Sequence, residues 1–328
     1  MSADLPRAIA RVLAGSSARR LAPTARSLSD RYRAASGSYV RTDEEALAYV
    51  ATRLPATYAA AQAAMRHVAE LWPAYAPSSQ LDLGAGPGAA AWAAAKVWPS
   101  VETVELRDRD EPMMRLGAEL AAGDFRWTWQ RADMTGVLGN ADLVTICYAL
   151  GELEPAAADA VASAAWQATN GCLVLVEAGT PSGFGLIGRL RRRLIEEGGH
   201  LVAPCPDDGT CPIAGADWCH FAARVGRSAL HRSLKGAERS FEDEKFSYVA
   251  FARGEPARAA GRVVRRPVAR RRYLELSVCA DGVIRQAGIG QTQACYRAAC
   301  KLGWGDGVPP DVLGLVRTAA PQDPGRST

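Results

Sequence analysis

The segment LDLGAGPGA, residues 81–89, decides the fold class of this chain. Its first residues alternate apolar and polar side chains as a short strand does, and glycines follow at positions 84, 86 and 88. An alanine-rich run at 89–98, AAAWAAAKVW, then predicts a helix. Glycine permits a tight turn and lets a ligand approach the backbone without a Cβ in between. The segment therefore predicts a strand, a glycine turn and a helix that together hold a small ligand.

Strands and helices continue to alternate on the C-terminal side of this segment. Strand-like runs lie at 101–108, 125–134, 141–150 and 171–179, and helix-like runs lie between them at 111–123 and 156–170. Such a repetition predicts an α/β fold with a parallel, doubly wound sheet, whose ligands bind at the carboxyl ends of the strands. A later run at 244–253, EKFSYVAFAR, reads as one more strand of the same sheet.

Acidic residues follow the next two strands of this predicted sheet. Glu105 lies toward the end of the second strand, where a carboxylate can accept hydrogen bonds from a ribose diol, and Asp133 follows the third. With the G-x-G-x-G spacing, this resembles the class I S-adenosylmethionine-dependent methyltransferases. The resemblance implies that S-adenosylmethionine is bound by Gly84, Ala85, Gly86, Gly88, Glu105 and Asp133. The stretch ICYALGEL, 146–153, lacks the Asn/Asp-Pro-Pro-aromatic motif of base-amine methyltransferases, so catalysis stays an open question.

A loop-like segment, CPDDGTCPIAGADWCHF at 205–221, holds Cys205, Cys211 and Cys219. Prolines and glycines in it favour turns that can wrap thiolates around a metal centre. Cys279, in a predicted hairpin at 273–290 with Asp281-Gly282 at its turn, is the best fourth ligand. Four thiolates suit a [4Fe–4S] cluster or a tetrahedral zinc ion, and His220 allows a Cys₃His zinc site. The long, irregular spacing and the Cys-Pro steps favour iron–sulfur.

Basic residues are concentrated in the C-terminal third of the chain. From Arg258 to Lys301 there are ten Lys or Arg against two acidic residues, a balance of +8, whereas the whole chain carries +4. A clustered basic face indicates a polyanionic partner such as RNA. The predicted RNA-binding residues are Arg189, Arg191, Arg192, Arg193, Arg262, Arg265, Arg266, Arg270, Arg271 and Arg272.

The composition suits a globular protein of 328 residues organised in four parts. We expect an N-terminal helical region at 1–76, a cofactor-binding core at 77–199, a cysteine and basic region with late core strands at 200–306, and a tail at 307–328. No apolar run is long enough to span a membrane. Eight cysteines without a signal peptide indicate a reducing compartment, where clustered thiols bind metals rather than pair.

Five segments together resemble a family of methyltransferase-like proteins that assemble the small ribosomal subunit. They are RLPATYAA (53–60), the glycine turn, the cysteine loop, FEDEKFSYVA (241–250) and KLGWGD (301–306). The resemblance implies a methyltransferase fold that binds S-adenosylmethionine and small-subunit rRNA. It also implies a [4Fe–4S] cluster held by Cys205, Cys211, Cys219 and Cys279. The expected location is the bacterial cytoplasm, or the mitochondrial matrix if the chain is eukaryotic.

Three functions remain open at this point. The first is a ribosome-assembly factor, a monomer when free, that binds rRNA and acts without catalysis. The second is an active rRNA methyltransferase, and the third is a non-enzymatic RNA-binding module that responds to iron or redox state.

Overall fold

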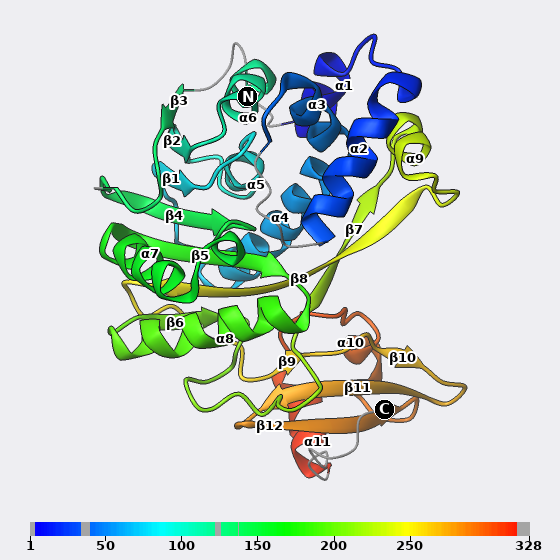
Figure 1. Ribbon diagram of the computed structural model, residues 1–328. Coiled ribbons are helices and arrows are strands. Elements are labelled where there is room, and N and C mark those ends of the chain that lie inside the picture. Colours follow the sequence, from blue (N-terminus) through cyan, green and yellow to red (C-terminus); the bar gives the residue numbers. More distant parts are fainter. Residues whose placement is uncertain (1–3, 34–39, 122–125, 137, 320–328) are drawn as a thin grey trace.

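The computed structural model describes residues 4–33, 40–121, 126–136 and 138–319. Within them, an eight-stranded sheet forms the larger part of the molecule and a four-stranded antiparallel sheet lies beside it (Figure 1). The strand order of the large sheet is β3-β2-β1-β4-β5-β8-β6, and β7 also pairs with β8. Its strands are β1 Ser79–Leu83, β2 Thr103–Asp108, β3 Arg126–Arg131, β4 Ala141–Cys147, β5 Thr169–Ala178, β6 His200–Ala203, β7 Phe221–Gly226 and β8 Phe241–Ala252.

The first five strands of the large sheet are parallel, and β8 runs antiparallel to β5. The C-terminal half of β8 pairs with β5 on one side and β6 on the other, while its N-terminal half pairs with β7. The result is a mixed α/β fold with a mostly parallel central sheet. The predicted fold class and the predicted late strand at 244–253 are therefore confirmed.

Helices cover both faces of the large sheet because its central strands are apolar on both sides. Leu173 and Leu175 of β5 pack against α7 (Pro155–Gln167) and α8 (Pro181–Glu196). Val174 and Val176, which point the other way, pack against α4 (Leu54–Leu71) and α5 (Ala89–Val97). The period of two along β5 thus divides the core into two layers.

The described residues before β1 are mainly helical. They form α1 (Leu5–Val12), α2 (Ala18–Arg33), α3 (Asp43–Thr52) and α4. Leu5, Val50 and Leu54 from these helices pack with Met113 and Leu120 of α6 (Glu111–Leu120) in one apolar cluster. The short helix α9 (Ala229–Lys235) packs against α2 and α3. No helix among the described residues is long and apolar enough to cross a membrane.

The small sheet has its own apolar core. Its strands are β9 Arg262–Val263, β10 Val268–Ala269, β11 Tyr273–Ala280 and β12 Val283–Gly290. The predicted hairpin joins β11 and β12, and both of its turn residues have positive φ, 52° at Asp281 and 70° at Gly282. Leu274, Leu276 and Val278 point into the core. The alternation along the strand therefore directs Cys279 to the opposite face.

Two short helices lie in the C-terminal part. The first is the single turn α10, Tyr296–Ala299. The second is α11, Pro310–Thr318, which lies within the segment expected as a tail. Val312, Leu313 and Val316 of α11 are buried in the core of the small sheet, which explains why this segment is helical. Residues 320–328 lie outside the described part of the chain.

Candidate functional site

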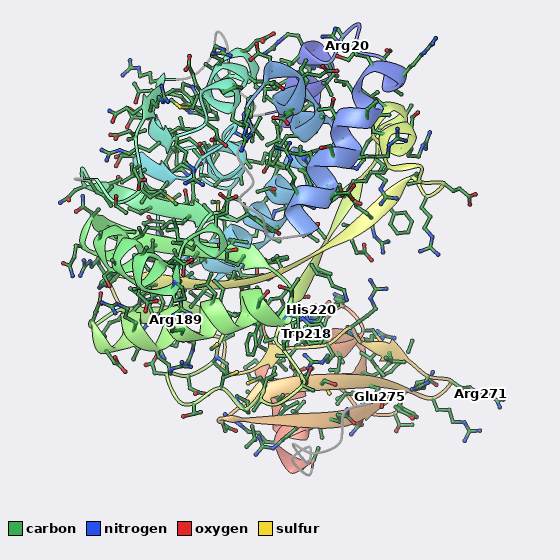
Figure 2. The ribbon with its side chains drawn as sticks, viewed as in Figure 1. Arg20, Arg189, Trp218, His220, Arg271 and Glu275 are labelled. Carbon is green, nitrogen blue, oxygen red and sulfur yellow. The ribbon has the colours of Figure 1, made fainter. Side chains whose placement is uncertain are left out.

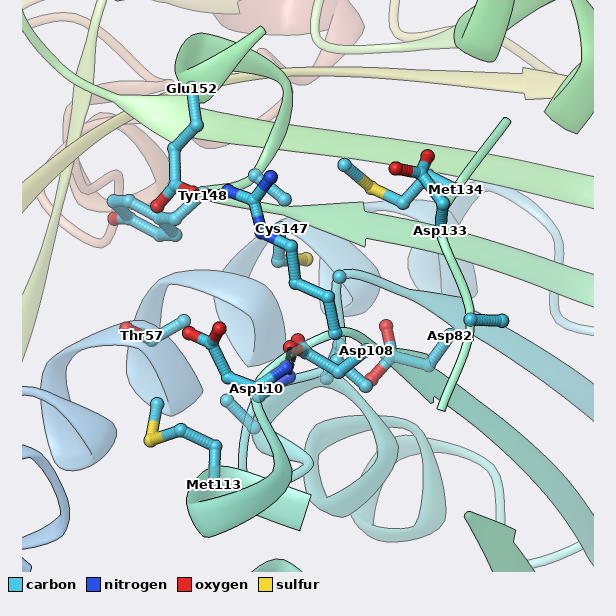
Figure 3. Close-up of a pocket in the computed structure, with 18 of the residues that line it drawn as sticks. Thr57, Asp82, Asp108, Asp110, Met113, Asp133, Met134, Cys147, Tyr148 and Glu152 are labelled. Carbon is cyan, nitrogen blue, oxygen red and sulfur yellow. Dashed lines mark hydrogen bonds and ion pairs between the residues drawn. The ribbon is translucent and has the colours of Figure 1, made fainter. Parts of the chain in front are cut away.

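The first candidate site is a pocket at the carboxyl ends of β1, β2 and β4. Figure 3 shows Asp82, Asp108 and Asp110 on one side of it, Asp133 on a second, and Tyr148 with Glu152 on a third. Gly84, Ala85 and Gly86 also line the pocket, whereas Gly88 does not. The structure thus brings most of the predicted cofactor residues together.

The glycine turn has the backbone conformation that its sequence predicts. Gly84 has φ of 65°, and a Cβ there would lie 2.5 Å from the Cβ of Ala149. Gly88 has φ of 88° and is the residue that precedes the first turn of α5. Residues that carry a side chain rarely adopt these backbone angles. Glycine is therefore the residue that forms this turn without strain. The backbone N–H of Gly86 donates to the Asp108 carboxylate at 2.7 Å.

Asp108, and not Glu105, supplies the carboxylate of the second strand. Glu105 lies in the middle of β2, does not line the pocket, and accepts a hydrogen bond from Arg107 Nε. Asp108 ends β2 and also accepts a hydrogen bond from the N–H of Asp110 at 2.8 Å. Burial raises the pKa of Asp108. Because the strand predicted at 101–108 already ended at Asp108, the position of this residue was the signal in the sequence.

Asp133 lies in the pocket wall as predicted. Its Oδ1 accepts hydrogen bonds from the backbone N–H of Thr135 at 2.9 Å and from the Thr135 hydroxyl at 3.0 Å. These two bonds lower the pKa of Asp133. The carboxylate is therefore ionised at neutral pH and held toward the pocket by a short turn.

Three further residues of the pocket were not predicted as cofactor ligands. The Cys147 thiol is buried, and burial raises its pKa well above its usual range, so it is neutral. Tyr148 has a positive φ of 59° and donates from its hydroxyl to Glu244 of β8 at 3.1 Å. Burial raises the pKa of Asp82 to about 7. Positive φ in a non-glycine residue is a tertiary constraint that a sequence pattern does not reveal.

The second candidate site is a pocket between the loop that follows β6 and the small sheet. Cys205, Cys211 and Cys219 of the loop line it together with Cys279 of β11, so the structure brings all the predicted ligands to one place. His220 does not line this pocket. Its ring stacks on Trp218, with centroids 5.3 Å apart, and meets the edge of Trp304.

Burial keeps the four thiols protonated in the absence of a metal. It raises the pKa of Cys205 to about 11 and that of Cys279 to about 12, and it also raises the pKa of Cys211 and Cys219. Among the described residues, no group of three or more His, Cys, Asp or Glu side chains is arranged to hold a metal ion.

Hydrogen bonds fix the cysteine loop to the large sheet. Trp218 Nε1 donates to the Gly179 carbonyl at 2.9 Å, and the Ser247 hydroxyl of β8 donates to the Cys219 carbonyl at 2.8 Å. On the side of the small sheet, the Asp207 carboxylate accepts from the N–H of Gly282 at 3.2 Å. The loop is therefore tied to both sheets.

The predicted RNA-binding arginines do not form one surface. Figure 2 shows Arg271 projecting from the end of the small sheet, away from α8, which carries Arg189. The side chains of Arg192, Arg193, Arg266, Arg270, Arg271 and Arg272 are exposed, and those of Arg189 and Arg265 are half-buried. Arg191 and Arg262 are only 6% and 2% exposed. These two line the cysteine pocket, so they were wrongly placed on the RNA-binding face.

Comparison with known proteins agrees with these features. A family model described as mitochondrial small ribosomal subunit Rsm22 matches residues 43–309. The human mitochondrial ribosome assembly protein METTL17 is 29% identical over 314 residues, which are 87% of this chain and 67% of that protein. The mitochondrial Rsm22-cox11 tandem protein 2 of Schizosaccharomyces pombe is 26% identical, and the match covers 85% of this chain but 45% of that protein.

Among solved structures, the plantazolicin methyltransferase BpumL in complex with SAH is similar in fold. It has 13% sequence identity and a TM-score of 0.42, with 76% of this chain and 98% of that chain covered. The extent of the family match, from Asp43 in the N-terminal helices to Pro309 beyond the small sheet, includes both candidate sites. The chain therefore belongs to the Rsm22 family.

Proposed function

We propose that this protein acts in assembly of the small ribosomal subunit, as a methyltransferase-like factor that carries a [4Fe–4S] cluster. The observation that carries the proposal is the convergence of Cys205, Cys211, Cys219 and Cys279 on one pocket between the large fold and the basic small sheet. The names of the human and fission-yeast relatives, which refer to ribosome assembly and to Rsm22, support the same function.

The donor set suits an iron–sulfur cluster, with a zinc ion as the alternative. Thiolates are the ligands that both centres prefer. The four thiols line one pocket. The long, irregular spacing of the cysteines in the loop at 205–219 and its Cys-Pro steps favour the cluster. When bound, the cluster would join the loop at 205–219 to β11, and its binding energy would stabilise the small sheet on the large one.

The first pocket fits S-adenosylmethionine. Asp108, held by the Gly86 N–H, would accept hydrogen bonds from the ribose hydroxyls, and Asp133 would face the adenine. Gly84 and Gly86 leave room for the amino-acid end of the ligand beside the backbone. When bound, this cofactor supplies an electrophilic methyl group; the residues described here bind and orient it.

Small-subunit rRNA is the proposed partner of the exposed arginines around β10 and β11. Arg271 and Arg272 have no carboxylate within 4.0 Å among the described residues, so both are available to phosphates. Arg266 and Arg270 pair only with exposed or half-buried acids, Asp243 and Glu275, at 3.1 and 3.0 Å. Exposed pairs of this kind exchange readily with a phosphate because they contribute little stability.

The central experiment is anaerobic purification of the full chain, followed by visible absorbance and by analysis of iron, sulfide and zinc. We expect about four iron atoms per chain, as the cluster requires. Cys279→Ser should lose the iron and the absorbance, whereas Cys300→Ser, at an exposed cysteine outside the pocket, should keep both. Stoichiometric zinc, or no metal in the wild-type protein, would contradict the cluster.

Three further assays complete the proposal. Small-subunit rRNA should bind the wild-type chain in a salt-dependent manner, and light scattering should find a monomer in the absence of RNA. Radiolabelled S-adenosylmethionine with precursor particles tests methyl transfer, the alternative function that the pocket's retained Asp108 and Asp133 favour. We propose that the protein lies in the same compartment as the ribosome that it helps to assemble. This compartment is the bacterial cytoplasm or the mitochondrion, the latter being the location that the names of the relatives give for those proteins.

A further inference from the structure

Two arginine side chains form part of the wall of the cysteine pocket. Arg191 comes from α8 and Arg262 from β9, and both are buried. On α8, Arg191 occupies the face that also buries Ile187, Leu190 and Leu194. An apolar residue would suit this position if packing alone decided it. The sequence therefore places a cation where the helix otherwise has hydrocarbon.

Each of these guanidinium groups is anchored by backbone carbonyls and retains one N–H without an acceptor. Arg191 Nη2 donates to the Asp207 carbonyl at 2.7 Å, and Arg191 Nε is buried without a partner. Arg262 donates from Nε to the Pro204 carbonyl and from Nη1 to the Gly305 carbonyl, both at 2.8 Å, while its buried Nη2 has no partner. Pro204 and Asp207, whose carbonyls anchor the two arginines, lie on either side of Cys205 and Pro206 in the sequence.

Neither cation has an anionic partner in the described part of the chain. No carboxylate oxygen lies within 4.0 Å of either guanidinium. A buried charge without a counter-ion is strongly destabilising, and so is a buried N–H without an acceptor. The nearby carboxylates, Asp207 in the pocket wall and Glu70 near Arg262, form no ion pair with either guanidinium. The pocket thus holds two buried cations, each with a buried N–H that lacks an acceptor.

Metal ligation would supply negative charge in this pocket. Ligation deprotonates the thiols. Four thiolates carry more negative charge than the core of an oxidised [4Fe–4S] cluster neutralises, so the ligated group is an anion. Its sulfur atoms are hydrogen-bond acceptors, and such bonds raise the reduction potential of a cluster.

We propose that Arg191 and Arg262 are the counter-cations of the thiolate-ligated group, to which they donate through Nε and Nη2 respectively. They are positioning residues that act on the group's charge. The inference rests on the cluster of the proposed function. It adds the two residues that set the reduction potential of the cluster and stabilise it. It also explains why these two arginines, unlike Arg192 and Arg266, are buried.

The test compares Arg191→Gln, Arg262→Gln and Arg191→Lys with a control, Arg192→Gln, in the full chain purified anaerobically without RNA. Arg192 is exposed and lies on the same helix. In the two glutamine variants we expect the midpoint potential to shift to more negative values, because a nearby cation stabilises the reduced cluster. Bleaching of the visible absorbance in air should be roughly tenfold faster, as expected for one lost charged hydrogen bond. Arg191→Lys should lie between wild type and Arg191→Gln.

Thermal melting provides a second measurement, because Arg191→Met should affect the melting temperature differently in the iron-loaded and the iron-free protein. In the iron-loaded protein, Arg191→Met should lower the melting temperature. After iron is removed with a chelator, the same substitution should leave it unchanged or raise it, because the unpaired buried charge is then removed. A purely structural arginine would lower the melting temperature in both states.

The results separate this inference from the proposed function. If the wild-type chain holds a cluster but Arg191→Gln and Arg262→Gln match Arg192→Gln in potential and bleaching rate, the counter-cation role is wrong and the cluster stands. If the wild-type chain holds no iron, the cluster and the counter-cation role both fail.

Discussion

Buried Asp82 should make the free energy of unfolding of the protein depend on pH. Replacing Asp82 by asparagine should remove this dependence. Asp82 is fully buried on β1 and accepts a hydrogen bond from the Thr145 hydroxyl at 2.7 Å. Burial raises its pKa from 3.8 to about 7. Because the folded state binds the proton more tightly than the unfolded state, this group's contribution to stability is complete below pH 3.8 and is lost as the pH rises through about 7.

The magnitude follows from the two pKa values. Full ionisation of Asp82 in the folded protein costs about 4 kcal/mol, at about 1.4 kcal/mol for each pKa unit. Most of the change within the accessible range falls between about pH 5 and pH 8, where the stability contributed by Asp82 should decrease by roughly 2–3 kcal/mol. Asparagine does not titrate, and its side-chain oxygen can still accept from Thr145.

The assay is urea unfolding of wild type and Asp82→Asn, prepared identically, at several pH values. The free energy of unfolding of the variant relative to wild type should rise by roughly 2–3 kcal/mol from about pH 5 to about pH 8. A constant offset between the two proteins, such as an altered hydrogen bond, does not affect this difference. Glu154→Gln, at an exposed carboxylate, controls for the loss of a negative charge. Stability curves of wild type and Asp82→Asn that stay parallel across the range would refute the reasoning.

Three other predictions concern the pocket and the basic sheet. Asp108→Ala should weaken S-adenosylmethionine binding about tenfold or more in calorimetry, as for a lost charged hydrogen bond, whereas Glu105→Ala, outside the pocket, should leave it unchanged. Gly84→Ala should destabilise the protein by about 1–2 kcal/mol from its left-handed backbone alone, and more because the new Cβ meets Ala149, as measured by urea unfolding. Changing Arg270–Arg272 to glutamine should reduce the slope of log affinity against log salt for rRNA by up to about 2–3; an unchanged slope would exclude these arginines from the interface.

The site could be predicted from sequence only where local patterns and chemistry suffice. Gly84 and Gly86 mark the turn because both have a positive φ, which residues with a side chain rarely adopt. Both also line the pocket. Asp281-Gly282 marks a hairpin turn for the same reason. Glu105 was chosen as the carboxylate of the second strand although the predicted strand already ended at residue 108, because the pattern does not show which of its acids meets the glycine turn.

The RNA-binding face shows what a count of charges cannot predict. Arg191 lies beside Arg192 in sequence, yet one is buried and the other exposed, because α8 turns by about 100° for each residue and only one of its faces packs on the sheet. Arg262 is buried because β9 pairs with β11 beside the cysteine loop. The spacing of Ile187, Leu190 and Leu194 indicated that Arg191 lies on the buried face of α8, a signal that the run of arginines at 189–193 concealed.

The sequence by itself determined the alternation of strands and helices, the glycine turn and the four cysteines, since each depends on backbone geometry or on residue type within a short stretch. Only the tertiary structure decided that Asp108 faces the pocket at the glycine turn and that two arginines enter the cysteine pocket. The physical reason is that burial and long-range pairing depend on which faces of distant elements pack together. A residue's charge or chemistry does not specify that packing.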